Sequence, residues 1–283
     1  MKPIFLSQVL IHKYWNVLSF VSITFGVLTL ISQCIPEFEE TAELIIGILA
    51  VVALLVGFIF VFVRYNTKKS LEMKINNINV EVITGDIFLC EGWKVIAFNE
   101  YFDTVVDDKI ISRKSLNGQY ITKTYGENIE VLDTLITSCK EADKMIIDTA
   151  SERKYGKQQR YELGTVIPDG EYFLTAFSKF DAENRAYLGI DDYVRCILNL
   201  WQECNIYYAE KDINLPLLGS GITRITNCRN IDEQGLLELL LWLLENCEMN
   251  FSNKCVIRFV LTGETMQKID LNRVEYHLKC RNK

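Results

Sequence analysis

Residues 44–63 read LIIGILAVVALLVGFIFVFV, a run that contains no charged side chain. A helix rises about 1.5 Å per residue, so about 20 apolar residues cross the roughly 30 Å hydrocarbon layer with every backbone group paired internally. A second run without charge covers residues 14–36. The two runs predict transmembrane helices at about residues 14–35 and 44–64, which together form a hairpin domain over residues 1–66.

A cleaved signal peptide is the alternative interpretation of the first run. That run is too long for such a segment, follows a polar lead of thirteen residues and is followed closely by a second apolar run. Two membrane spans are therefore the prediction that we adopt.

The flanking charges predict the orientation of the hairpin, because Lys and Arg side chains are retained on the cytoplasmic side. Bases precede the first span and follow the second, at Lys2, Lys13, Arg64, Lys68 and Lys69. The loop between the spans carries acids and no base, with Glu37, Glu39, Glu40 and Glu43. We therefore predict a protein of the cell membrane with two spans, a short acidic external loop and both termini in the cytoplasm.

The composition argues against several classes of function. The net charge of -7 disfavours a nucleic-acid partner. With only two histidines, and with nine cysteines that show no C-x-x-C pair, a zinc site or a histidine-based catalytic triad is not expected. We predict no metal site, no cofactor and no catalytic residue.

Residues 67–283 alternate short β-rich runs with helical periodicity, which is typical of a cytoplasmic α/β layer fold. The predicted strands are residues 80–84, 95–98, 161–167, 172–177, 213–217 and 256–261. Two of them flank Pro168, Asp169 and Gly170, a turn that predicts an antiparallel hairpin. The predicted helices are residues 191–204 and 232–247. Residues 103–160 show no pattern from which an element can be predicted.

A glycine-containing loop follows one predicted strand, in the sequence LPLLGSGITR of residues 215–224. Such loops expose backbone N–H groups that can hold a diphosphate, and Arg224 would add a charge-assisted contact. The alternative is a simple strand-to-helix turn, because the third glycine of a dinucleotide-binding motif and the lysine of a P-loop are both missing.

Polar residues also stand at the ends of two other predicted strands. Asp86 follows a strand and Gly85, and Asn99 closes the next strand. In open α/β sheets the ligand crevice lies outside these strand ends, so both residues are candidates to meet the glycine loop at one ligand. Each has a local alternative, since Asp86 can cap a helix and Asn99 can close a turn.

Together, GDI at residues 85–87, Asn99 and PLLGSGI at residues 216–222 resemble the macro domain, a mixed α/β module that binds ADP-ribose. The resemblance implies that Asp86 receives the adenine amino group near the Ile87 backbone and that Asn99 lies near the distal ribose. The diphosphate would be wrapped by the loop that contains Leu218, Gly219, Ser220, Gly221, Ile222, Thr223 and Arg224.

Further segments narrow the resemblance, namely NEYFDT at residues 99–104, DDKIIS at 107–112 and NRAY at 184–187. With two leading spans, they look like the membrane-anchored macro-domain effector of type II Thoeris anti-phage defence. That family implies a partner TIR-domain enzyme that makes an ADP-ribose-containing signal from NAD, a macro-like domain that senses it, and membrane damage that kills the infected cell. A homo-oligomer is expected, because one hairpin has too few helices to enclose a pore.

One departure from the macro-domain pattern bears on catalysis. Macro domains that hydrolyse ADP-ribose conjugates usually follow the asparagine with a run of glycines, but Tyr101, Phe102 and Asp103 stand here. We therefore favour binding over catalysis and keep a membrane-bound hydrolase as the alternative.

Two further features have open interpretations. The bases Arg153, Lys154, Lys157 and Arg160 are interpreted as a solvated loop, with contacts to phosphates or lipid headgroups as the alternative. Gly57, in the second span, either allows close helix packing or is an ordinary lipid-compatible residue.

Overall fold

The computed structural model describes residues 8–33, 40–143, 145–150, 153–181, 183–229, 231–248 and 251–281. The chain divides into two compact units, Met1–Lys69 with Leu271–Lys283 and Ser70–Asp270. Lys2 and the part of the acidic loop that holds Glu37 and Glu39 lie outside the described residues.

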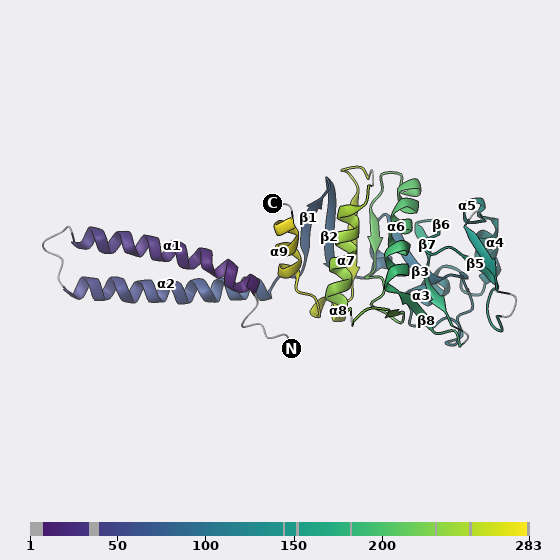
Figure 1. The fold of residues 1–283 in the computed structure, drawn as a ribbon, viewed down its shortest axis with the longest axis horizontal. Coiled ribbons are helices and arrows are strands. Elements are labelled where there is room, and N and C mark those ends of the chain that lie inside the picture. The colour runs from purple at the N-terminus through teal and green to yellow at the C-terminus, as the bar shows by residue number, and fades with distance from the viewer. Residues whose placement is uncertain are drawn as a thin grey trace. The chain divides into compact units, whose positions relative to one another are not determined.

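The first unit contains a hairpin of two long helices, α1 (Gln8–Gln33) and α2 (Glu40–Asn66), which lie side by side in Figure 1. Within them, Val9–Ile31 and Leu44–Asn66 are long and apolar enough to cross a membrane. Many of their large hydrophobic side chains are exposed, which suits helices whose surroundings are apolar.

Gly57 lies directly against α1. A Cβ atom at this position would be 2.6 Å from Val17 Cγ1, so only glycine fits there without a shift. Nearby, the Tyr14 hydroxyl donates to the Leu54 carbonyl over 3.3 Å. The interpretation of Gly57 as a residue that allows close helix packing is confirmed within one hairpin.

A third helix, α9 (Leu271–Arg281), also belongs to the first unit. The sequence predicts one domain over residues 67–283. It does not indicate which element α9 packs against, because the pattern of a short amphipathic helix shows only that one face is buried. The structure instead groups α9 with α1 and α2.

The second unit is built on a mixed sheet. Its central strands are parallel neighbours in the order β2 (Ile78–Thr84), β11 (Val256–Leu261), β9 (Ile213–Leu215), β3 (Trp93–Asn99) and β7 (Tyr172–Phe180). The outer strands are β1 (Leu71–Ile75) beside β2, then β6 (Val166–Asp169) and β8 (Ala186–Gly189) paired with β7, and β10 (Arg224–Thr226) beside β8. The predicted α/β class with a mixed sheet is confirmed.

Helices flank this sheet in Figure 1. The helices of the second unit are η2 (Ile87–Leu89), α3 (Leu116–Thr124), α4 (Ile129–Ser138), α5 (Lys140–Asp143), α6 (Ile190–Tyr207), α7 (Glu233–Asn246) and α8 (Gly263–Gln267). The predicted helices at residues 191–204 and 232–247 are confirmed as α6 and α7. Asp232 caps α7 by accepting a hydrogen bond of 2.8 Å from the Gly235 N–H.

The predicted strand at residues 161–167 is wrong in one respect, because it is two strands. β5 (Gln159–Tyr161) pairs with β4 (Ile146–Thr149), and β6 begins only at Val166. Gly164 separates them with a φ of +91°, a conformation that breaks a strand and favours glycine. The turn after β6 is confirmed, since Asp169 pairs with Tyr172 across it.

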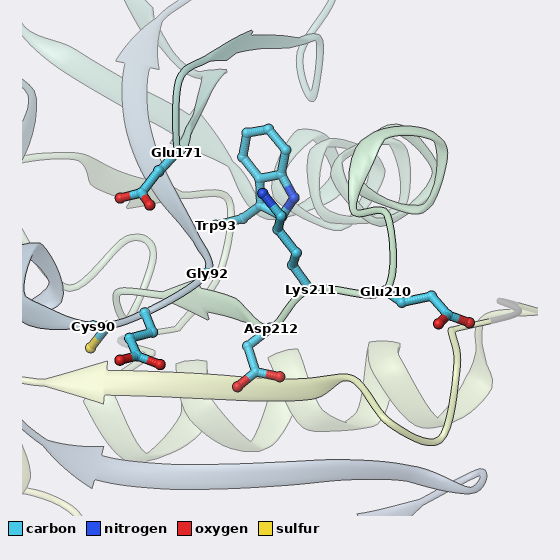
Figure 2. A pocket seen from close by; sticks show the side chains of 8 residues that line it. Cys90, Gly92, Trp93, Glu171, Glu210, Lys211 and Asp212 are labelled. Carbon is cyan, nitrogen blue, oxygen red and sulfur yellow. The ribbon is translucent and has the colours of Figure 1, made fainter.

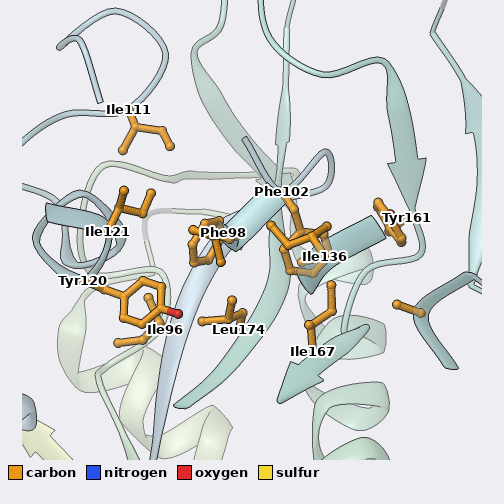
Figure 3. Packing of buried hydrophobic residues seen from close by; sticks show 13 residues of the cluster. Ile96, Phe98, Phe102, Ile111, Tyr120, Ile121, Ile136, Tyr161, Ile167 and Leu174 are labelled. Carbon is orange, nitrogen blue, oxygen red and sulfur yellow. The ribbon is translucent and has the colours of Figure 1, made fainter. Parts of the chain in front are cut away.

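A buried cluster assembles around β3 and β7, with Ile96 and Phe98 on one strand and Leu174 on the other (Figure 3). Tyr120 from α3 and Ile136 from α4 pack into it. Residues 103–160, whose pattern predicted no element, therefore supply much of the core beside the end of β3.

Candidate ligand-binding site

The carboxyl ends of the parallel strands bring together the segments that the sequence singles out. β2 is followed by Gly85 and Asp86, β3 ends at Asn99, and β9 is followed by residues 216–223. Because β2, β11, β9 and β3 are parallel neighbours, these ends lie along one edge of the sheet, here called the carboxyl edge. In open α/β sheets this edge is where ligands bind.

Asp86 caps the short helix η2. Its Oδ1 accepts a hydrogen bond of 3.0 Å from the Phe88 N–H, while the side chain is exposed at the carboxyl edge. Ile87 points into the core and is 5% exposed. The capping alternative for Asp86 is confirmed, and a cap that uses one oxygen is compatible with a ligand contact at the other.

Asn99 is buried and closes the turn after β3. Its Oδ1 accepts from the N–H groups of Tyr101 and Asp103 at 3.0 and 3.3 Å, and its Nδ2 donates to Asp103 Oδ2 at 2.8 Å. The turn-closing alternative is confirmed. The contact of Asn99 with a distal ribose stays a prediction, and this turn would be the surface that a ribose meets.

Phe102 occupies a conformation that bulky residues rarely adopt, with a φ of +49°. Its ring is fully buried and packs edge-on against Tyr161 at a centroid distance of 5.1 Å. Glycine would adopt this backbone without strain, so the core contacts of Phe102 offset a conformational cost at the end of β3.

Asp103 forms a buried ion pair with Arg153. The Arg153 Nη2 and Nη1 atoms lie 2.6 and 3.1 Å from the two carboxylate oxygens, and the Lys157 N–H donates to the same carboxylate over 2.7 Å. Arg153 also donates to Asn184 Oδ1 over 3.0 Å and stacks on the Tyr101 ring. The turn after β3 is thereby tied to two segments that are distant in sequence.

The interpretation of the bases at residues 153–160 as a solvated loop is wrong for three of the four. Besides Arg153, the Lys157 ammonium lies 2.6 Å from Asp133 Oδ1, and Arg160 Nε lies 3.5 Å from Glu100 Oε2. Acidic partners distant in sequence neutralise this cluster, which leaves Lys154 as its exposed base.

The glycine loop at residues 216–223 is partly buried and partly exposed. The Leu218 side chain is 2% exposed, and its carbonyl accepts from the buried Tyr193 hydroxyl over 3.1 Å. Gly219 has a φ of +86°, and the Ser220 hydroxyl donates to the Leu217 carbonyl over 2.6 Å. The base of the loop is therefore fixed on α6.

The exposed half of this loop begins at Gly221. Ile222 is 62% exposed, Thr223 is half-buried and Arg224 is exposed. The sequence predicts a helix directly after the loop, which is wrong, because the short strand β10 follows and α7 begins only at Glu233. A diphosphate here would meet loop N–H groups rather than a helix N-terminus.

Comparison with known proteins decides the family. Residues 80–262 match the family model described as Thoeris protein ThsA, Macro domain. The chain belongs to this family. It is also 38% identical over 268 residues to the Thoeris protein ThsA of Bacillus amyloliquefaciens (strain Y2), across 93% of this chain and 88% of that protein.

Solved macrodomain structures from Oceanobacillus iheyensis are similar in fold to part of this Thoeris family member. A mutant with ADPR matches with a TM-score of 0.49 and 12% identity, over 74% of this chain and 99% of that chain. The form with ADP matches with a TM-score of 0.47 and 12% identity, over 74% of this chain and 97% of that chain.

Glu100 is a residue at the carboxyl edge that the sequence did not single out. Burial raises the pKa of its carboxyl, and the charge of Arg160 offsets this only in part. The sequence places Glu100 directly after Asn99, but its partner Arg160, at 3.5 Å, lies in a segment without a predicted element. In this Thoeris family member the edge therefore holds a buried carboxyl close to Asn99.

A cavity of about 560 Å³ lies at the opposite edge of the sheet (Figure 2). Its lining includes Trp93, the first residue of β3, and Asp212, which precedes β9. β3 rises about 3.3 Å per residue, so this cavity is roughly 20 Å from Asn99. It contains no residue that the sequence predicts to bind a ligand.

Proposed function

We propose that the second unit binds an ADP-ribose-containing signal at the carboxyl edge and that the helical hairpin is the output of this binding. One observation supports the proposal: Asp86, the turn after Asn99 and residues 216–223 lie at the same edge of the sheet. The chain that contains this sheet belongs to the Thoeris macro-domain family. A partner TIR-domain enzyme that consumes NAD would supply the signal.

Each segment has a separate role in this proposal. The Asp86 carboxylate accepts the adenine amino group, and the exposed half of the 216–223 loop donates N–H groups to the diphosphate. The turn held by Asn99 and Asp103 receives the distal ribose and whatever group it carries. The base of the glycine loop is fixed by Tyr193, so the loop would need little ordering on binding.

The hairpin of α1 and α2 crosses the cell membrane in this proposal, with both termini in the cytoplasm. The bases Lys13, Arg64, Lys68 and Lys69 flank the spans on one side, as retention of Lys and Arg in the cytoplasm requires. Ligand binding changes self-association, and the assembled hairpins disrupt the bilayer. Death of the infected cell would follow.

Hydrolysis of an ADP-ribose conjugate is the second candidate. Glu100 supports it, because burial raises the pKa of its carboxyl and thereby makes the carboxylate a stronger base. Two observations argue against hydrolysis. Glu100 is 4% exposed, and its Oε2 lies 3.5 Å from Arg160 Nε. Phe102 also occupies a position where macro domains that hydrolyse ADP-ribose conjugates usually have glycine. We therefore favour binding without turnover.

Asp86→Asn is expected to weaken ADP-ribose binding by about tenfold or more, because the amide keeps the cap on η2 but turns a donor towards the adenine amino group. Calorimetry on detergent-solubilised full-length protein measures the affinity, and chromatography of the same samples measures turnover. The control is Glu91→Gln, which removes an exposed carboxylate at the opposite edge. Equal binding by both variants would contradict the assigned role of Asp86, and product release would favour the hydrolase.

A further inference from the structure

The helix α9 packs on the ends of α1 and α2 that carry the basic flanks. Val9, Leu10 and Tyr65 form a small buried cluster there, and Tyr276 of α9 packs against it. The Tyr276 ring also meets the His12 ring edge-on at a centroid distance of 5.6 Å. Tyr276 of α9 therefore packs against residues of both helices of the hairpin.

Asn272 connects the two helices through its side-chain amide. Its Nδ2 donates to the Tyr65 carbonyl of α2 over 2.9 Å, and its Oδ1 accepts from the Lys13 ammonium of α1 over 2.8 Å. Asn272 is 4% exposed. A buried amide that bonds to two different helices holds them in one geometry, because breaking either buried hydrogen bond costs free energy.

Glu275 makes the same connection with charge. Its Oε2 lies 2.7 Å from the Lys68 ammonium, just after α2, and 3.7 Å from the Lys13 ammonium of α1. Two ammonium groups that face each other repel, and the carboxylate between them reverses the sign of that interaction. Without α9, the basic flanks that set the orientation of the hairpin would repel each other.

Ionisation of Glu275 is strongly favoured in this position. Burial alone would raise the pKa of its carboxyl, but hydrogen bonds from Lys279 and Lys68 and the charges of Lys68 and Lys13 together lower the pKa to about 2. A lowered carboxyl pKa means that the contribution to stability is complete above about pH 4.5 and is lost as the pH falls towards 2. These contacts are therefore fully formed at neutral pH.

The chain links α9 directly to the carboxyl edge. β11 lies between β2 and β9 in the sheet. Its last residue, Leu261, therefore lies between the end of β2, which leads to Asp86, and the end of β9, which leads to the glycine loop. Thr262 then caps α8, and α9 begins at Leu271. Within the second unit, Lys268 of this connector pairs with Glu233 of α7 over 2.6 Å. A displacement at the carboxyl edge therefore has a short covalent path to α9.

We propose that α9 is a clamp that holds the start of α1 and the end of α2 together in the resting state. Release of this clamp frees the hairpin. The trigger rests on the proposed function, since a ligand at the carboxyl edge would act through β11 and α8. The clamp itself rests only on the contacts of Asn272 and Glu275. It acts as an autoinhibitory contact, because the hairpin is restrained until the clamp opens.

The test is dye release from vesicles that carry the full-length protein, first without ligand. Glu275→Ala and Asn272→Ala are each expected to raise ligand-free release about tenfold, because each removes the partner that α1 and α2 share. The matched control is Glu127→Ala, which removes an exposed carboxylate from the second unit and is expected to leave release unchanged.

Two outcomes would overturn the clamp. They are wild-type release rates in Glu275→Ala and Asn272→Ala, or an equal increase in Glu127→Ala. Calorimetry with ADP-ribose on the same proteins separates the two proposals. If the wild type does not bind ADP-ribose, the proposed function fails, while the ligand-free comparison still decides the clamp.

Discussion

Gly221→Glu is expected to abolish ADP-ribose binding without unfolding the protein. No heavy atom lies within 4 Å of a Cβ at Gly221, its φ is not positive, and the residue is exposed. A glutamate therefore fits, and its carboxylate would face the diphosphate. Two like charges about 4 Å apart near a protein surface repel by about 4 kcal/mol, which corresponds to about a thousandfold in affinity.

The neighbouring Gly219 is unsuitable for this experiment. Its φ is +86°, and a Cβ there would lie 3.2 Å from the Tyr193 ring, so a substitution would disturb the fold as well as the ligand. Ile206→Glu is the matched control, because Ile206 is 67% exposed near the end of α6 that leads to the opposite edge. Calorimetry should show loss of binding in Gly221→Glu alone. Wild-type affinity in Gly221→Glu would exclude the loop from the site.

Asp103→Asn is expected to destabilise the second unit by about 3 kcal/mol. Asp103 is 1% exposed and Arg153 is 9% exposed in its side chain, so removal of the carboxylate leaves a buried guanidinium without its counter-charge. The same substitution disturbs the bond to Asn99 and the N–H of Lys157. For a unit of this size the loss corresponds to a fall in melting temperature of roughly 6–12 °C.

Thermal unfolding of the full-length protein in detergent, followed by tryptophan fluorescence, measures this shift. The matched control is Glu264→Gln, which removes one carboxylate from an exposed pair with Lys268 at 3.9 Å. That change is expected to cost less than about 0.5 kcal/mol. A melting temperature of Asp103→Asn equal to that of the control would show that the ion pair does not hold the turn after β3.

Local patterns in the sequence were sufficient to predict the hairpin, the helices α6 and α7 and the turn at Pro168. Each has a signal within about 20 residues, such as an apolar run, helical periodicity or a turn dipeptide. Strand-terminal polar residues also predicted the carboxyl edge, because parallel strands place Asp86, Asn99 and the glycine loop at the same side of a sheet.

The interactions that fix these features depend on residues far apart in sequence. Asp103 and Arg153 are separated by 50 positions, and nothing in either local pattern predicts that they pair. The left-handed backbone of Phe102 likewise needs the surrounding core, since its residue type disfavours that conformation. Helix α9 shows the same limit, because Glu275 meets Lys68 across 207 positions.

Lys13 and Lys68 flank the two spans in the sequence and contact α9 in the structure. In the sequence they predict orientation, since bases flank membrane spans on the cytoplasmic side. In the structure the same ammonium groups bind Glu275 of α9. The residues that predict the orientation of the hairpin are thus also residues that contact α9.

The central claim is that a ligand bound by the second unit controls the hairpin, and dye release from vesicles carrying the wild-type protein tests it most directly. The vesicles would be titrated with ADP-ribose and with the products that a TIR-domain enzyme makes from NAD. We expect little release without ligand and a saturable increase with it, because a ligand shifts an equilibrium only by its differential affinity for two states. Equal release with and without every one of these ligands would contradict it.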